Sequence, residues 1–253
     1  MDFTLLGLFL IAAFIGGLTS GLSGFAMGLV VSGIWLHLIT PSQNALLIAL
    51  CGLVTQGSGI WRVRHAIKWQ AVLPFIVGSG VGVAIGTLLL TTIDQNSVRL
   101  TIGVLLIVFS LYNLLRPKIA VPEAGTPVAV GVGVANGVIG GLTGLGGIAM
   151  AVWSQLRGGN KDAQRAIFQP VMFATFLMSA IAFGFTGAYT RETMTLYALA
   201  LPALIAGIGC GIWLYGKLDD AAFRRVVLVL LFASGLSLVV PAVLRAAHLL
   251  PNQ

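Results

Sequence analysis

Apolar segments of membrane-spanning length recur along the whole chain, separated by short polar stretches. A helix needs about 20 consecutive apolar residues to cross the hydrocarbon core of a bilayer. Uninterrupted segments of this kind lie at 43–61, 70–92, 98–115, 164–186, 194–216 and 226–244. The pattern therefore predicts an all-α polytopic membrane protein.

Two further apolar segments, 3–39 and 127–155, contain glycine-rich interruptions. The first includes GLTSGLSGFAMG at 17–28, and the second includes GLTGLGGIAM at 141–150. Glycine is a poor helix former, so each segment is expected to break into two arms. Residues 127–155 are too few for two crossings at about 20 residues each. We therefore expect a hairpin there, with two short arms that meet near the middle of the membrane.

The glycine motif belongs to an internal repeat. Residues 21–27 align with residues 144–150 at an offset of 123, and a second set of positions repeats at an offset of 125. The second set pairs Gly82, Gly86, Asp94 and Arg99 with Gly207, Gly211, Asp219 and Arg224. We therefore divide the chain into a first repeat at 1–116, a cytoplasmic linker at 117–126 and a second repeat at 127–253, all within one integral membrane domain.

The distribution of basic residues predicts the course of the broken segments. If each broken segment enters and leaves on one side, eleven Lys and Arg residues share a side and three lie on the other. If 127–155 crosses once, the count becomes seven against seven. Because Lys and Arg collect in cytoplasmic loops, the hairpin is favoured, with both termini outside. Each half then makes an odd number of crossings, which predicts two inverted repeats, each a re-entrant helical hairpin plus three transmembrane helices.

Composition agrees with this class and limits the chemistry. Charged residues make up 8% of the chain, the mean hydropathy is +1.01 and the net charge of +7 is explained by topology and not by nucleic acid binding. All seven acids map to loops or span ends, so no carboxylate proton relay is expected, and no Lys or Arg is expected deep in a span. The two cysteines have no metal-ligand or disulfide pattern, and no cofactor is expected.

The repeated motif is the candidate substrate site. A new helix should begin at the turn of each hairpin, and its first amides carry the positive end of the helix dipole. Glycines let an anion approach those amides, and nearby hydroxyls add donors. The predicted substrate-binding residues are Thr19, Ser20, Gly21, Ser23, Gly24, Thr143, Gly144, Gly146 and Gly147. Inverted symmetry would bring the two tips into one site for a small oxyanion.

Other polar residues have two interpretations. Four residues fall at membrane depth and are candidates to line a path: Gln56, Asn136, Gln169 and Thr175. For any one of them we favour the other role, that of a hydrogen-bond partner between helices. Glycine in membrane helices also serves close packing, and we favour that role for the pairs Gly82/Gly86 and Gly207/Gly211.

Three functional classes compete. A secondary permease for a small anion fits a site of amides and hydroxyls. An exporter of amino or organic acids is the alternative within transport, but the ammonium group of a zwitterion would lack a deep carboxylate partner. A membrane phosphatase would need acidic, Arg or His groups at the hairpin tips, where the sequence offers Gly, Ser, Thr and apolar residues. We therefore do not expect an enzyme.

The duplicated glycine motif, the Gly-x3-Gly pairs, the Asp and Arg that follow them and the short basic loops resemble the sulfite exporter TauE/SafE family. The resemblance covers essentially the whole chain. It implies a bacterial-type inner membrane permease that exports sulfite, a sulfonate such as sulfoacetate, or a related sulfur-containing anion. The expected partners are this small anionic substrate and membrane lipid, while a homo-oligomer and the coupling ion are left open.

Overall fold

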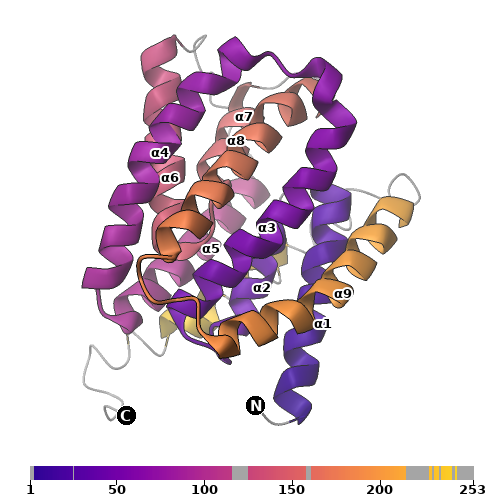
Figure 1. Cartoon of the computed structure of the whole chain (residues 1–253), viewed down its shortest axis with the longest axis vertical. Helices are drawn as coiled ribbons and strands as arrows, with labels where there is room; N and C mark the ends of the chain where they lie inside the picture. The colour runs from indigo at the N-terminus through magenta and orange to yellow at the C-terminus, as the bar shows by residue number, and fades with distance from the viewer. Residues whose placement is uncertain are drawn as a thin grey trace.

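The computed structural model describes residues 3–24, 26–115, 125–157, 161–214, 228–229, 231–233, 235–240 and 243. Within these ranges the chain forms helices and no strands. Seven of the helices are long and apolar enough to cross a membrane. The expected all-α polytopic architecture is therefore confirmed (Figure 1).

The first half contains five α-helices and one 3-10 turn. Their bounds are α1 (Phe3–Ser23), α2 (Met27–Trp35), α3 (Pro41–Val63), η1 (Arg64–Ala66), α4 (Trp69–Thr92) and α5 (Gln95–Leu115). The start of α3 is locally encoded: Thr40 accepts a hydrogen bond from the Gln43 amide, the Gln43 side chain accepts one from the Thr40 amide, and Pro41 occupies the first turn.

The second half repeats this order. Its described helices are α6 (Thr126–Thr143), α7 (Ile148–Arg157), α8 (Lys161–Phe183) and α9 (Arg191–Leu214). Parts of the last expected span, 226–244, lie outside the described residues, as do residues 117–124 of the expected linker. Within that span, residues 228–229, 231–233 and 235–240 are helical.

Glycines form two close helix seams that join the halves. A Cβ added to Gly82 would meet the carbonyl oxygen of Val134 on α6, and one added to Gly86 would meet that of Val138. In the same way, Gly207 and Gly211 of α9 lie against the backbone of α1. In both pairs, a glycine later in one helix contacts a residue later in the other. The two helices of each pair therefore run parallel. The packing role expected for these four glycines is confirmed.

The helices α3 and α8 cross the centre of the bundle in opposite directions. Gly52 packs against Phe176, and Gly59 packs against Gln169, so the partners move backwards along α8 as they move forwards along α3. These two spans are also the most deeply buried of the seven. Residues from both are therefore available to any site inside the bundle.

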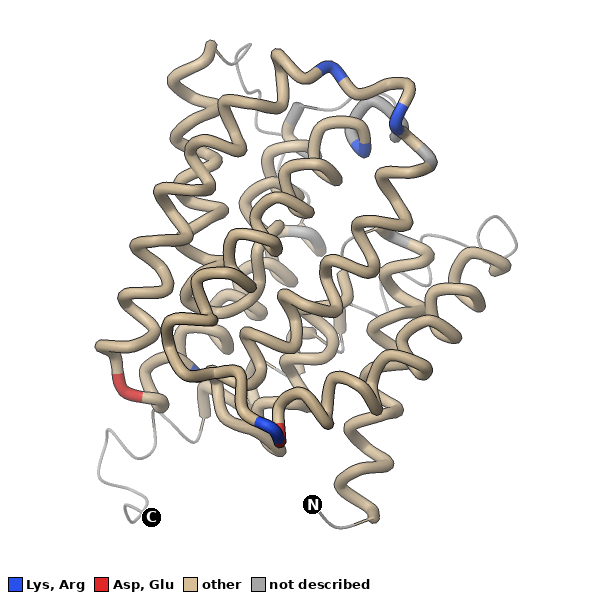
Figure 2. The backbone as a smooth tube through the Cα atoms, in the orientation of Figure 1, with Lys and Arg blue, Asp and Glu red and all other residues tan. Residues whose placement is uncertain are grey.

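Lys or Arg residues lie at both ends of the bundle, whereas the Asp and Glu residues drawn in Figure 2 lie at one end. We call the end where α3 meets α4 the basic end, because Arg64 and Lys68 lie at that junction. We call the end where α4 meets α5 the opposite end, and it carries Asp94. The chain begins α1 at the opposite end (Figure 1).

Each broken segment turns back toward the end where it started. Trp35, the last residue of α2, stacks on Phe9 of α1 with ring centroids 4.6 Å apart and donates a hydrogen bond to the Phe9 carbonyl at 3.1 Å. The short helix α7 likewise leads from the second turn to the start of α8 at the basic end (Figure 1).

The arms of the hairpins are unequal. We expected two short arms in 127–155, but α6 has 18 residues and is long enough to cross by itself. Only the returning helices are short, with 9 residues in α2 and 10 in α7. The second hairpin therefore turns far along α6 and not at the middle of a short segment.

Candidate functional site

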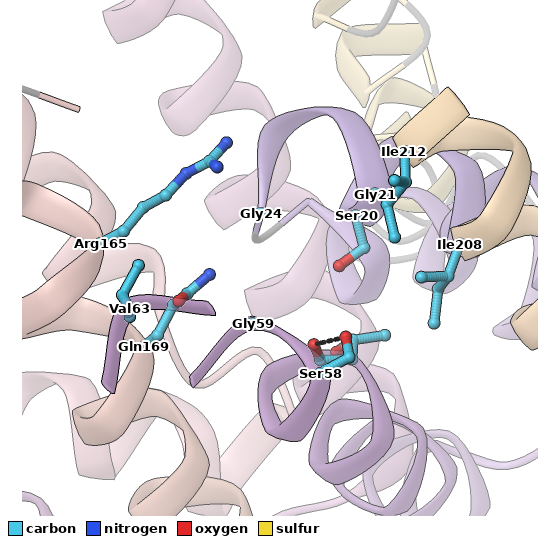
Figure 3. Close-up of a pocket in the computed structure, with 11 residues that line it drawn as sticks. Ser20, Gly21, Gly24, Ser58, Gly59, Val63, Arg165, Gln169, Ile208 and Ile212 are labelled. Carbon is cyan, nitrogen blue, oxygen red and sulfur yellow. Dashed lines mark hydrogen bonds between the residues drawn. The ribbon is translucent and has the colours of Figure 1, made fainter. Parts of the chain in front are cut away.

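A small cavity lies beside the first glycine motif, between α1, α3, α8 and α9 (Figure 3). Its volume is about 40 Å³, which is room for roughly three water molecules. Val63 ends α3 at the basic end and Arg165 lies in the second turn of α8, so the cavity is displaced toward that end. The lining residues are Ser20, Gly21, Gly24, Thr55, Ser58, Gly59, Val63, Arg165, Gln169, Ile208 and Ile212.

Gly24 forms the turn that places the first motif against this cavity. Its φ of +89° lies in the left-handed region that favours glycine, so the chain leaves α1 there at little conformational cost. The Gly24 amide donates to the Ser20 carbonyl at 2.7 Å, and the Gly24 carbonyl accepts from Nε2 of Gln56 at 3.2 Å. The turn is therefore held by α3 and has its Cα facing the cavity.

Two polar side chains of α8 reach toward this turn (Figure 3). A Cβ built on Gly24 would lie 3.7 Å from Nε of Arg165 and 3.8 Å from Nε2 of Gln169. Gln169 is 4% exposed, and its Oε1 is buried without a hydrogen-bond partner among the described residues. A guanidinium and an amide thus converge on one small space.

Arg165 is the charged residue among the site residues that the sequence interpretation missed, and the hydroxyls of Thr55 and Ser58 were missed as well. We assigned Arg165 to a cytoplasmic loop and expected no basic side chain at the site, but it belongs to α8 and lines the cavity. A signal was present, because Arg165 and Gln169 are four residues apart and so share one face of a helix. The positive charge beside the first motif belongs to a residue more than 130 positions away in sequence. The sequence of the motif itself could not reveal it.

The α3 wall of the cavity carries hydroxyl groups. Thr55 Oγ1 donates to the Gly52 carbonyl at 3.0 Å, and Ser58 Oγ donates to the Thr55 carbonyl at 2.8 Å. Ser20 supplies a further hydroxyl from α1 on the other side. The described lining residues include the Arg165 guanidinium and no carboxylate.

The second glycine motif has different surroundings. Asn136 Oδ1 accepts a hydrogen bond from the Gly147 amide at 2.7 Å, and Asn136 Nδ2 donates to Thr175 Oγ1 at 3.1 Å. Asn136 and Thr175 are both fully buried. The amide of Gly147, which we expected to bind substrate, therefore already has a protein partner.

The remaining residues of the second motif complete a closed turn. Gly144 caps α6 with a φ of +75°, and its amide donates to Gly140. Thr143 donates to the Ile139 carbonyl at 2.6 Å and accepts from the Leu145 amide at 3.1 Å. A Cβ on Gly146 would lie 3.0 Å from the Thr175 methyl group. Residues 140–147 are all buried.

The expected residues therefore separate into two groups. Ser20, Gly21, Gly24 and Gln169 meet at the cavity, with Gln56 behind the turn. Asn136, Thr175 and the second motif form a packed network, and none of them lines this cavity. Thr19 is buried and donates to the Gly16 carbonyl, while the side chain of Ser23 lies outside the described residues. The described residues include no group of three His, Cys, Asp or Glu side chains that could hold a metal ion.

Comparisons with known proteins agree on the class of the chain. The family model described as sulfite exporter TauE/SafE matches residues 8–238. A protein of Cupriavidus necator named "Probable sulfite/organosulfonate exporter TauE" is 23% identical over 87% of this chain and 88% of its own length. A protein of Bacillus subtilis named "Probable membrane transporter protein YunE" is 27% identical over 89% of this chain and 90% of its own length. No solved structure matches the chain.

Proposed function

The chain belongs to the sulfite exporter TauE/SafE family, and we propose that it exports a small sulfur-bearing anion that loads at the cavity beside Gly24. The family and both relatives are membrane transporters, so the chain is a transporter and not an enzyme. With seven candidate spans and bacterial relatives, it is a multi-pass protein of the inner membrane.

One observation supports the anion and its place. The cavity combines the Arg165 guanidinium with the Gln169 amide, and the part of its lining that the structure describes includes no carboxylate. Hydrogen bonds from a guanidinium to an oxyanion are charge-assisted and roughly twice as strong as neutral ones. These described residues disfavour a cation, and none of them offers the ammonium group of an amino acid a negatively charged partner. A small anion is therefore the ligand that fits best.

Sulfite or a short sulfonate is the substrate we propose within that class. The relative in Cupriavidus necator carries sulfite and organosulfonate in its name, whereas the relative in Bacillus subtilis is named only as a transporter. The cavity volume of about 40 Å³ favours a compact headgroup of a few heavy atoms. Ile208 and Ile212 add an apolar wall, against which the carbon chain of a sulfonate would pack.

The position of the cavity supports the proposed direction of transport. Lys and Arg collect on the cytoplasmic side of membrane proteins, so we assign the basic end to the cytoplasm. The cavity then opens on the side from which an exporter takes its substrate. We also propose that the halves are inverted repeats, which is supported by the opposite directions of α3 and α8.

The proposed function is tested by flux into proteoliposomes that contain the purified chain. We expect uptake of labelled sulfite that unlabelled methanesulfonate or sulfoacetate inhibits, and no uptake of alanine or choline. Replacing Arg165 by Gln should weaken transport by roughly tenfold or more, because a hydrogen bond to a charged group contributes about 1.5–3 kcal/mol.

The matched control is Lys68→Gln, which removes an exposed positive charge at the same end without touching the cavity. Transport should stay within about twofold of the parent protein. Flux of alanine or choline without flux of any sulfur anion would overturn the proposed substrate class. An equal loss in both variants would show that Arg165 acts only through the general surface charge.

A further inference from the structure

The walls of the cavity beside Gly24 present different hydrogen-bonding groups (Figure 3). The α8 wall carries Arg165, whose guanidinium has N–H donors and no acceptor. The α3 wall carries the hydroxyl of Thr55. A ligand in this space is therefore offered donors on one side, and the state of the Thr55 hydroxyl decides what it meets on the other.

The hydroxyl of Thr55 can only accept a further hydrogen bond. A threonine hydroxyl has one hydrogen and two lone pairs, and the hydrogen of Thr55 Oγ1 is already donated to the Gly52 carbonyl at 3.0 Å. Thr55 is 7% exposed, so its lone pairs face the cavity and not bulk water. Ser58 on the same wall also donates to a carbonyl, but its side chain is exposed, and water can donate to its lone pairs.

The amide of Gln169 adds a second acceptor without a partner. Its Oε1 is buried and has no hydrogen-bond partner among the described residues. The amide fits there because Gly59 has no side chain: a Cβ on Gly59 would lie 2.8 Å from Cδ and 3.0 Å from Oε1 of Gln169. The terminal torsion of glutamine is soft, so Oε1 can turn toward a hydrogen. The described surroundings of the cavity therefore hold more buried acceptors than they hold hydrogens to satisfy them.

A ligand that suits both walls has anionic oxygens and one acidic hydrogen. Hydrogen sulfite in its hydroxyl form has both. The doubly charged sulfite ion has acceptors alone, so one of its oxygens would face the lone pairs of Thr55. The described lining also supplies one positive charge, that of Arg165, which matches a monoanion. A second buried negative charge would lack a partner there and would be unfavourable.

We propose that the cavity selects hydrogen sulfite over the sulfite dianion, and that Thr55 is the specificity-determining residue, whose Oγ1 accepts the hydrogen bond from the anion's hydroxyl group. The identity of the anion rests on the proposed function. One proton then leaves the cell with each exported anion.

Ionisable groups of the protein must be separated from the ionisation of the ligand. Apart from Arg165, the four helices around the cavity carry the following charged or titratable residues: Cys51, Arg62, Lys161, Asp162, Arg191, Glu192, Tyr197 and Cys210. The adjoining turn η1 adds Arg64 and His65. The side chains of Arg62, Lys161 and Asp162 lie outside the described residues. Ionisation of any of these groups would change the binding of every monoanion, whereas loss of the ligand's own proton changes the binding of sulfite alone.

The test is calorimetry on the purified full-length chain in detergent, across the pH range in which hydrogen sulfite loses its proton. Methanesulfonate is the control ligand, because it stays a monoanion and has no acidic hydrogen. We expect the affinity for total sulfite to fall about tenfold per pH unit above the pKa of hydrogen sulfite, while the affinity for methanesulfonate changes by less than about twofold.

Thr55→Val tests the residue, because valine keeps the shape of threonine and removes the acceptor. At the acidic end of the range, we expect the preference for sulfite over methanesulfonate to fall about two- to tenfold. Thr91→Val is the matched control. Thr91 also donates to a carbonyl of its own helix, at 2.8 Å from Leu88, but it is exposed on α4 and does not line the cavity.

Three results would overturn this inference. An affinity for sulfite that stays constant or rises with pH contradicts selection of the monoanion. A pH dependence shared by both anions assigns the effect to the protein. An unchanged preference in Thr55→Val, including equal losses for both anions, removes the role of Thr55. Each of these leaves anion binding in place, whereas failure of both anions to bind would contradict the proposed function as well.

Discussion

The two glycine motifs of this chain have similar sequences and different surroundings. At the first, Gly24 faces a cavity with the side chains of Arg165 and Gln169 within reach. At the second, the amide of Gly147 is bound by Asn136, and the whole turn is buried. Both turns use glycines in the left-handed region. The shared sequence therefore encodes the break in the helix, and the neighbouring helices decide what the break is used for.

The difference comes from the helices that face each turn. The first turn contacts the part of α8 nearest the basic end, where Arg165, Phe168 and Gln169 lie. The second turn contacts Met172 and Thr175 further along α8, and Ala45 on α3. Backbone and side-chain atoms of α3 and α8 lie directly against the second turn, whereas the first turn borders the cavity. We infer that the second motif fixes the architecture and that the first serves the substrate.

The largest difference between the two turns is expected when a bulky side chain is added to the second turn. A Cβ on Gly144 would lie 2.7 Å from Cα of Ala45, and its φ is +75°. We expect Gly144→Val to remove nearly all folded protein, because backbone strain and a clash with the α3 backbone add together. The measurement is the monodisperse fraction after detergent extraction.

Gly187 provides the matched control for that substitution. It has a φ of +74°, and a Cβ there would meet nothing within 4 Å. Gly187→Val should therefore retain most of the folded protein, since it carries the backbone strain of about 1–2 kcal/mol without the clash. Similar yields for the two variants would contradict the packed description of the second turn.

The hydrogen bond from Asn136 should contribute stability without contributing affinity. Asn136→Leu leaves the buried amide of Gly147 without its partner, at a cost of about 1–3 kcal/mol. We expect a lower midpoint of thermal unfolding and unchanged binding of sulfite to the folded fraction. Gln70→Leu, on the exposed start of α4, is the control. A clear loss of affinity in Asn136→Leu would place the second turn in the substrate site.

Sequence alone predicts the helices and the breaks well, because both depend on local composition. The bounds expected for the apolar segments 70–92 and 98–115 lie within three residues of the bounds of α4 and α5. The packing of Gly82 and Gly86 was also predictable from their spacing. The use of the first motif was not, since it depends on Arg165, which is distant in sequence from the turn that it contacts. Asn136 is only 11 residues from Gly147, but its position in the sequence does not show which group its side chain binds. A repeat identifies matched positions but not their partners.

The first turn should tolerate a small side chain structurally and lose its ligand. A Cβ on Gly24 would lie 3.5 Å from Phe168, which is ordinary contact, so Gly24→Ala should cost about 1 kcal/mol through its positive φ. That methyl group would occupy space beside Arg165 and Gln169. We therefore expect at least tenfold weaker sulfite binding in monodisperse protein, measured by calorimetry. Normal affinity in this variant would move the site away from the first motif.

The smallest effect is expected at Ser20, whose hydroxyl lines the cavity opposite α8. Ser20→Ala removes one neutral donor, worth about 0.5–1.5 kcal/mol, so affinity for sulfite should fall by up to about tenfold. Ser58→Ala is the matched control, because the Ser58 hydroxyl donates to the Thr55 carbonyl and is engaged within α3. If calorimetry shows the larger loss for Ser58→Ala, the anion binds against the α3 wall and not between Ser20 and Arg165.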